Sequence, residues 1–258
     1  LTSTQINALT TGQVSSLISS QIAALTTAQM ASMGTLQAGA LTSVQAPSIE
    51  TIDLVSLSTS SIRALDSNAI AGLTTRQIES LSSLQFSNLQ SQQLSALAYE
   101  QVFAIQSQQF VLFSSTQISG LSQVQILAIT SATLGALSST AISGLTTSAI
   151  INLLDEQIQG MQSSQIPGFT TDQLAAFSNY QIALLSSGQA QGLSSSQLGS
   201  VTTTAISSLT TLALQGISAG SIVGLTSNQV GSLSTGQLVA LTTTQVAALT
   251  PQQVIGLN

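Results

Sequence analysis

An eight-residue repeat runs through the whole sequence and constrains the fold more than any other feature. Residues 1–256 divide into 32 consecutive octads without insertion or deletion, and Leu257 and Asn258 follow the last octad. Segments such as LTSTQINA, LTTRQIES and LTTTQVAA give the consensus Leu-Thr-x-x-Gln-Ile-x-small. A fixed short period of this kind is typical of a solenoid, in which each repeat stacks on its neighbours.

The residue types at each octad position predict which side chains are buried. Position 1 is Leu, Ile, Met, Phe or Val in all 32 octads, and position 6 is a large apolar residue in 29, the exceptions being Ala38, Ala46 and Ala190. We therefore expect both positions to face the core. Position 8 is Ala, Ser or Gly in 28 octads, which indicates crowding, whereas the varied position 4 is expected to face solvent.

Two helix-start signals agree on one register within the octad. Position 2 is Ser or Thr in 23 octads; as an N-cap it places the Gln of position 5 at N3, which makes Thr-x-x-Gln a capping box. Positions 1 and 6 then form the pair of a hydrophobic staple. Because the next N-cap follows eight residues later, each octad has room for about one helical turn. Position 8 is Gly nine times and Asn twice, and we expect the left-handed conformation that ends many helices there.

The three prolines fit a chain of short helices. Pro251 stands at position 3, the first helical residue, where its missing N–H costs little. Pro47 and Pro167 stand at position 7 and disfavour helical geometry in the preceding residue. We therefore predict an all-α solenoid of 32 octapeptide repeats that forms one continuous domain over residues 1–258. A β-solenoid is the alternative, since Ile, Val and Thr favour strands and a turn can bring positions 1 and 6 to one side.

A second regularity is superimposed on the octads. Gln is absent from position 5 in nine octads, and these nine form three runs of three. The residues are Asp53, Ser61 and Ala69, then Thr133, Ala141 and Ala149, then Ala205, Ala213 and Ser221. One interpretation is the duplication of variant octads. The other is that the solenoid meets another surface there and smaller side chains let backbones approach, which makes these nine residues candidate assembly contacts.

The composition excludes several kinds of chemistry. The chain has no His and no Cys, and its two basic residues are Arg63 and Arg76, so a hydrolase triad, a Ser–Lys dyad or a thiolate nucleophile cannot be built. The net charge of −6 opposes nucleic-acid binding, which depends on Lys and Arg at phosphates. Polar residues interrupt every apolar stretch before the roughly 18 residues of a membrane span. We expect no enzyme activity, no cofactor, no nucleic-acid partner and no membrane insertion.

The few charged residues suggest surface roles. Asp155 and Glu156 are adjacent and could join a weak Ca²⁺ site, but a solvated pair is the simpler interpretation and we assign no metal. The acidic residues Glu50, Asp53, Asp66 and Glu79 share one stretch with the two arginines, which suggests exposed charge pairing.

The phenylalanines could be taken for an aromatic binding strip. Phe113, Phe169 and Phe177 occupy position 1, so we expect them in the core in place of Leu. Phe103 occupies position 7 and is expected to be partly exposed.

The consensus Leu-Thr-x-x-Gln-Ile/Val-x-Ala/Gly resembles octapeptide tracts in very large secreted bacterial surface proteins, described as adhesin-like exoproteins. The resemblance covers the whole chain. It implies an extracellular or cell-surface location and a structural or adhesive role, and it brings no catalytic residue. The start at Leu1, without Met or a signal sequence, suggests a mature form or an excerpt of a longer protein.

We therefore expect a non-enzymatic extracellular structural protein that serves as the subunit of a self-assembling filament or surface layer, or as the stalk of an adhesin. Its charged residues make up only 4%, and weak repulsion between copies favours association. The expected partners are further copies or neighbouring domains of a longer chain. The alternative is a binding module for ice, a glycan or another surface, for which the Thr runs at 202–204 and 242–244 suit ordered water.

Overall fold

The fold is built from short helices that follow the octads one by one. The computed structural model describes residues 1–257, and within that range it has thirty α-helices, two 3-10 helices and no strand. The predicted all-α architecture is confirmed, and the β-solenoid is excluded. The helices are α1 (Ser3–Asn7), α2 (Thr11–Ser15), α3 (Ser19–Ala23), α4 (Thr27–Ala31), α5 (Thr35–Gly39), η1 (Ala46–Ser48), α6 (Thr51–Ser56), α7 (Thr59–Ala64), α8 (Ser67–Ala71), α9 (Thr75–Ser80), α10 (Ser83–Ser87), α11 (Ser91–Ser95), α12 (Tyr99–Phe103), α13 (Ser107–Phe110), α14 (Ser115–Ser119), α15 (Gln123–Ala128), α16 (Ser131–Leu134), α17 (Ser139–Ile142), α18 (Thr147–Ile151), α19 (Asp155–Gly160), η2 (Ser163–Gly168), α20 (Thr171–Ala176), α21 (Asn179–Ala183), α22 (Ser187–Gln191), α23 (Ser195–Ser200), α24 (Thr203–Ile206), α25 (Thr211–Gly216), α26 (Ala219–Ile222), α27 (Ser227–Gly231), α28 (Thr235–Ala240), α29 (Thr243–Ala248) and α30 (Pro251–Ile255).

The helices belong to two compact units, Leu1–Ala136 and Leu137–Asn258. Each unit by itself is an α-solenoid of octads. One continuous domain over residues 1–258 remains a prediction.

The N-cap predicted at position 2 starts most helices, and many of these have the full capping box. In α9 the Thr74 hydroxyl accepts a hydrogen bond from the Gln77 N–H at 3.2 Å, and Gln77 Oε1 accepts one from the Thr74 N–H at 2.7 Å. The same reciprocal pair opens α2, α20 and α29. A side-chain cap is worth about 1 kcal/mol, and the repeat supplies one to most helices.

Several helices, α9 and α20 among them, end at an apolar residue of position 1 that takes an extended conformation. Leu81, for example, has φ −61° and ψ 135°, and its N–H donates to the carbonyl of Ile78 at 3.3 Å. The extended residue turns the chain into the next N-cap. This explains why a helix of about one turn recurs every eight residues.

The predicted left-handed helix ends at position 8 are wrong, because no residue in the described part of the chain has a positive φ. Gly72 ends α8 with φ −77°, an ordinary right-handed value. Its Cα instead lies close to the preceding turn of the solenoid, so that an added Cβ would stand 2.6 Å from the carbonyl oxygen of Ser43. Close approach between backbones, not φ, favours small residues at position 8.

The proline positions agree with the helices. Pro251 is the first residue of α30, as predicted. Pro47 and Pro167 lie in η1 and η2, the two 3-10 helices. The ring of a proline at position 7 is accommodated by this tighter winding.

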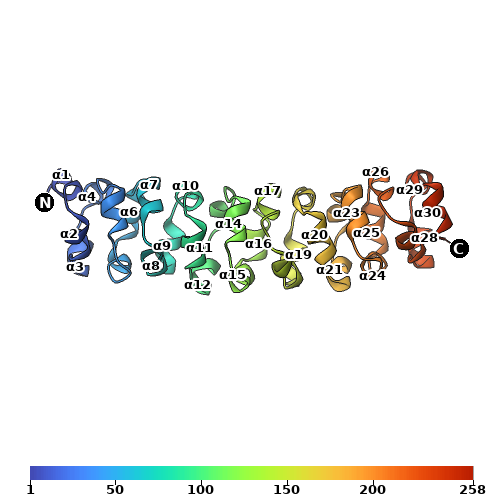
Figure 1. Cartoon of the computed structure of the whole chain (residues 1–258), viewed down its shortest axis with the longest axis horizontal. Helices are drawn as coiled ribbons and strands as arrows, with labels where there is room; N and C mark the ends of the chain where they lie inside the picture. Colours follow the sequence, from blue (N-terminus) through green and yellow to red (C-terminus); the bar gives the residue numbers. More distant parts are fainter. Residues whose placement is uncertain (258) are drawn as a thin grey trace. The chain divides into compact units, whose positions relative to one another are not determined.

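Helices three octads apart pack against each other within each unit. In the first unit α1 packs on α4 and α12 on α15, and in the second unit α22 packs on α25 and α27 on α30. Three octads, or 24 residues, therefore complete one turn of the solenoid, which we call a coil. Figure 1 shows α10, α11 and α12 as one coil of the first unit, with α12 and α15 both along the lower edge of the view.

The core lies inside the coils and is made by positions 1 and 6, as predicted. Every position-6 residue from Ile6 to Val230 is buried, and position 1 is buried from Met33 to Leu233. Burial of one such side chain contributes about 1.5 to 3 kcal/mol. Exposed side chains at position 4, among them Leu36 and Val124, confirm that this position faces solvent.

The phenylalanines are also buried or exposed according to their octad position. Phe113, Phe169 and Phe177 are buried at position 1, and Phe86 and Phe110 are buried at position 6. Phe110 and Phe113 stack with ring centroids 4.4 Å apart. Phe103, expected to be partly exposed, is exposed.

Candidate functional site

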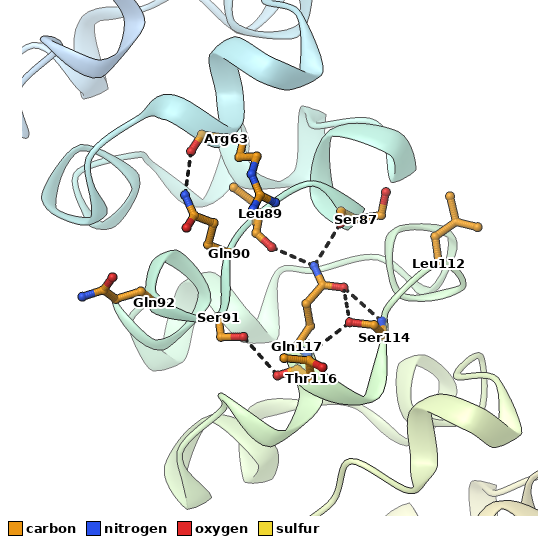
Figure 2. A pocket seen from close by; sticks show the side chains of 10 residues that line it. All are labelled: Arg63, Ser87, Leu89, Gln90, Ser91, Gln92, Leu112, Ser114, Thr116 and Gln117. Carbon is orange, nitrogen blue, oxygen red and sulfur yellow. Dashed lines mark hydrogen bonds between the residues drawn. The ribbon is translucent and has the colours of Figure 1, made fainter. Parts of the chain in front are cut away.

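The Gln at position 5 is the polar group that the fold uses most heavily. Figure 2 shows Gln117, whose Oε1 accepts hydrogen bonds from the N–H and the hydroxyl of Ser114 at 3.0 and 3.1 Å. Its Nε2 donates to the carbonyls of Ser87 and Leu89, at 3.2 and 2.9 Å, in the preceding coil. One side chain therefore caps its own helix and ties it to the coil before it.

These bonds give a coil that carries Gln at position 5 two different faces. Gln45 Nε2 donates to the carbonyls of Val14 and Leu17, 31 and 28 residues earlier, at 2.8 and 2.7 Å. Gln229 donates to Leu198 and Val201 with the same separations. Amide donors point to the preceding coil, and the carbonyls of positions 6 and 1 point to the following one. We call this set of bonds the amide ladder.

Each run of octads without Gln corresponds in length to one coil. Three octads make one coil, so a run of three such octads fills one coil of the ladder. The first and third runs each lie within one unit. Sequence reasoning found the runs but could not connect them with coils, because the number of octads per coil is a tertiary property.

Eight of the nine candidate assembly residues are buried, and Ser221 is half-buried. The buried ones are Asp53, Ser61, Ala69, Thr133, Ala141, Ala149, Ala205 and Ala213. These side chains cannot themselves touch a second molecule. The prediction that their octads form an assembly contact therefore rests on the exposed positions of those octads.

Two of the helices without Gln, α7 and α25, pack closely on the coil before them. The most extensively packed helix pairs are α5 with α7 in the first unit and α22 with α25 in the second, and α7 and α25 carry Ser61 and Ala213. The Ser61 hydroxyl still donates to the carbonyl of Met33 at 2.9 Å. Ala213 has no polar group with which to replace the amide.

The prediction that Asp53 takes part in exposed charge pairing is wrong. Asp53 is only 4% exposed, because position 5 faces the preceding coil, and its Oδ1 accepts a hydrogen bond from the Thr27 hydroxyl at 2.7 Å. Asp66 caps α8 through the Asn68 N–H at 2.8 Å, and Arg63 donates to the carbonyl of Asn88 at 3.4 Å.

The acidic pair at the start of α19 is engaged by a tyrosine. Tyr180 donates its hydroxyl hydrogen to Asp155 Oδ2 at 2.6 Å. This hydrogen bond, and next the negative charge of Asp155, raise the pKa of Tyr180 above its usual 10.0. Within the described residues, no three acidic side chains come together as a metal site.

Two hollows on the side surface of the first unit are candidate binding sites. The hollow in Figure 2 has a volume of about 490 Å³ and is lined mainly by polar residues, among them Arg63, Gln90 and Thr116. Several of these groups already bond to the chain, since Gln90 Nε2 donates to the Arg63 carbonyl and the Ser91 hydroxyl donates to the Thr116 carbonyl.

The second hollow, of about 460 Å³, lies between α9 and α12 and exposes two aromatic rings, Tyr99 and Phe103. Their ring planes are 9° apart and their centroids are separated by 6.5 Å. Neither hollow contains His, Lys or Cys, since the chain has none of these residues.

Over the residues described, no helix has the length and apolar character needed to cross a membrane.

Fold and repeat together define an α-solenoid repeat protein. A family model described as the ALTTAQ repeat matches residues 46–83 and residues 222–258, one segment in each unit. No curated protein matches the chain. The family match agrees with the octad period and adds no activity or ligand.

Proposed function

We propose that this chain is a non-enzymatic structural protein that assembles by stacking coil on coil. The observation that carries the proposal is the two-faced coil, with amide donors on one side and carbonyl acceptors on the other. Two unlike, complementary faces form a heterologous contact, and contacts of that type build open filaments when they do not close into a ring.

The first coil of the 258-residue chain presents the donor face to solvent. Gln5, Gln13 and Gln21 are exposed there, although their Oε1 atoms still cap their own helices. In later coils the same side chain is buried and its Nε2 bonds the coil before it. These amides therefore have the geometry to bond one further coil.

The last coil presents the acceptor face. Val246 and Val254 at position 6 are 52% and 49% exposed, whereas Ile222 and Val230 at the same position are buried beneath a following coil. In the register of the ladder, Gln13 of an added coil would meet the carbonyls of Leu238 and Leu241. A second copy, or further octads of a longer polypeptide, has the chemistry to cover this face.

A filament or surface-layer subunit, or the stalk of an adhesin, is the role that fits such a stack. Charged residues make up only 4% of the chain, so repulsion between copies is weak. The resemblance to octapeptide tracts of secreted bacterial surface proteins supports an extracellular or cell-surface location.

Electron microscopy and sedimentation of the 258-residue chain over a range of concentrations test the proposal. We expect end-to-end particles that lengthen with concentration. Val246→Asp together with Val254→Asp places charge on the acceptor face and should raise the concentration needed for assembly by about tenfold or more, because a buried unpaired charge is costly. Val239→Asp is the matched control, since Val239 is 81% exposed at position 7 on the side of the solenoid. A chain that stays monomeric at every concentration, or an equal effect of the control, would contradict stacking through the coil faces.

A further inference from the structure

Exposed aromatic rings are rare in this chain and are concentrated in one helix. Five of the six phenylalanines are buried in the core. The exposed rings are Tyr99, Phe103 and Tyr180, and the first two lie one turn apart on α12, 45% and 58% exposed. Their exposure is not required by the repeat, which places Ser or Thr at position 3 in most octads.

The octad that carries these rings, LAYEQVFA, departs from the consensus at a cost to its own folding. Ala98 replaces the N-cap hydroxyl, so α12 begins without a side-chain cap, and such a cap is worth about fivefold in a helix equilibrium constant. Local departures from an otherwise consistent pattern are expected at functional sites. The same octad carries the two exposed rings, Tyr99 and Phe103.

The rings form one wall of an open hollow of about 460 Å³ on the side of the coils. Thr75 and Glu79 of α9, Glu100 of α12 and Gln106 beyond it complete the lining, and all four side chains are exposed. The two ring planes differ by only 9°. Two nearly parallel aromatic rings are thus surrounded by hydroxyl, carboxylate and amide groups that accept hydrogen bonds.

We propose that this hollow binds a pyranose unit of a neutral glycan. The C–H face of a pyranose ring is flat and apolar and can lie on the aromatic rings, while its outward hydroxyls donate to the carboxylates of Glu79 and Glu100. A few polar groups around an apolar floor are typical of a ligand site. The hollow is open at the surface, which suits a sugar unit within an extended chain.

An organic cation is the competing ligand, since cations also lie on aromatic faces. The charge around the hollow does not favour it strongly. Both carboxylates are exposed and therefore screened by water and salt, and Arg76 occupies the same octad position as Glu100 one coil earlier. Hydroxyl groups match these acceptors without requiring a net negative site.

NMR chemical-shift titration of the 258-residue chain with maltohexaose, cellohexaose and chitohexaose tests the proposal. We expect at least one sugar to give saturable shifts confined to α9 and α12. Tyr99→Ser and Phe103→Ala should each weaken that binding by about tenfold, and far-UV circular dichroism should stay unchanged because both side chains are exposed.

Tyr180→Ser is the matched control, because it removes the third exposed tyrosine or phenylalanine ring from the second unit and should leave binding unchanged. Absence of shifts with all three sugars would overturn the proposal. Shifts at α12 with tetramethylammonium and none with the sugars would overturn it in favour of a cation site. The hollow lies away from the end faces of the stack, so these results are independent of the assembly experiment.

Discussion

Replacing Gln77 by Ala measures what the amide ladder contributes to one coil. Gln77 Oε1 accepts from the Thr74 N–H at 2.7 Å, and its Nε2 donates to the carbonyls of Ala46 and Ile49 at 2.8 and 2.7 Å. The side chain is buried between its own coil and the preceding one. The substitution therefore removes a cap and two bonds between coils at once.

The magnitude follows from the partners that remain. The Ala46 carbonyl keeps the Ile49 N–H at 3.2 Å, so its loss is that of an ordinary hydrogen bond, about 0.5 to 1.5 kcal/mol. The Ile49 carbonyl lies in the extended linker, outside the helical pattern, and leaving it unsatisfied costs about 1 to 3 kcal/mol. With the weakened cap, we expect Gln77→Ala to lower the free energy of unfolding by about 2 to 5 kcal/mol.

Urea denaturation followed by far-UV circular dichroism is the assay, with Thr74→Ala as the matched control in the same octad. Thr74→Ala removes the hydroxyl that caps α9 but leaves the bonds from Gln77 to the preceding coil, so it should cost only about 1 kcal/mol. Long repeat arrays can lose two-state behaviour, so the slopes of the transitions must agree before the midpoints are compared. An effect of Gln77→Ala no larger than that of Thr74→Ala would refute the ladder as a stabilising element.

Gln77→Glu extends the test to charge. A carboxylate facing the carbonyls of Ala46 and Ile49 in a buried site has a raised pKa in the folded state. The loss of stability should therefore be smallest below the pKa of an unfolded glutamate, about 4.3, and should grow as the pH rises through the folded pKa. A loss that does not change with pH would show that the side chain has escaped to solvent.

Two further predictions concern single contacts. Gly224→Ala should lower the melting temperature through a loss of about 1 to 3 kcal/mol of stability, because the added Cβ would stand 2.0 Å from the Ser195 carbonyl oxygen. Gly12→Ala is the control and should be neutral or slightly stabilising, because nothing lies within 4 Å of its added Cβ. Equal effects of the two substitutions would disprove the close approach at Gly224. The raised pKa of Tyr180 implies that stability from its bond to Asp155 is present below the usual pKa of 10.0 and is lost as the pH rises through the raised value. In a Tyr99→Phe background, Asp155→Asn should lower the pKa of Tyr180 in an absorbance titration, and an unchanged midpoint would exclude the bond in solution.

Much of the local structure could be predicted because the residues that start each helix and the residues that form the core lie within a single octad. The Thr-x-x-Gln spacing correctly placed the N-caps, as at Thr74 and Gln77, and the apolar residues at positions 1 and 6 correctly marked the core. These signals act within eight residues, so they do not depend on how the octads pack. The helix ends were predicted wrongly for the opposite reason, since Gly72 is small because of Ser43 in another coil.

The candidate sites could be predicted only in part. Position 7 indicated that Phe103 would be exposed, and its pairing with Tyr99 lies within one octad. The approach of both rings to Glu79 of α9 depends on which octads are neighbours in space. Asp53 was expected at the surface among other charges and is buried, because nothing within its own octad shows that position 5 faces another coil.

The sequence by itself determined a chain of short capped helices with a continuous apolar side and no means of acid–base or nucleophilic catalysis through His, Cys or Lys. Only the tertiary structure decided that three octads make one coil, and with it the second role of every ladder glutamine, the meaning of the runs without Gln, and the two unlike faces of the stack. The physical reason is the sequence separation of the interacting residues. Caps and staples join residues fewer than eight positions apart, whereas the bonds of Nε2 join residues 28 and 31 positions apart, and that separation is set by how the coils pack.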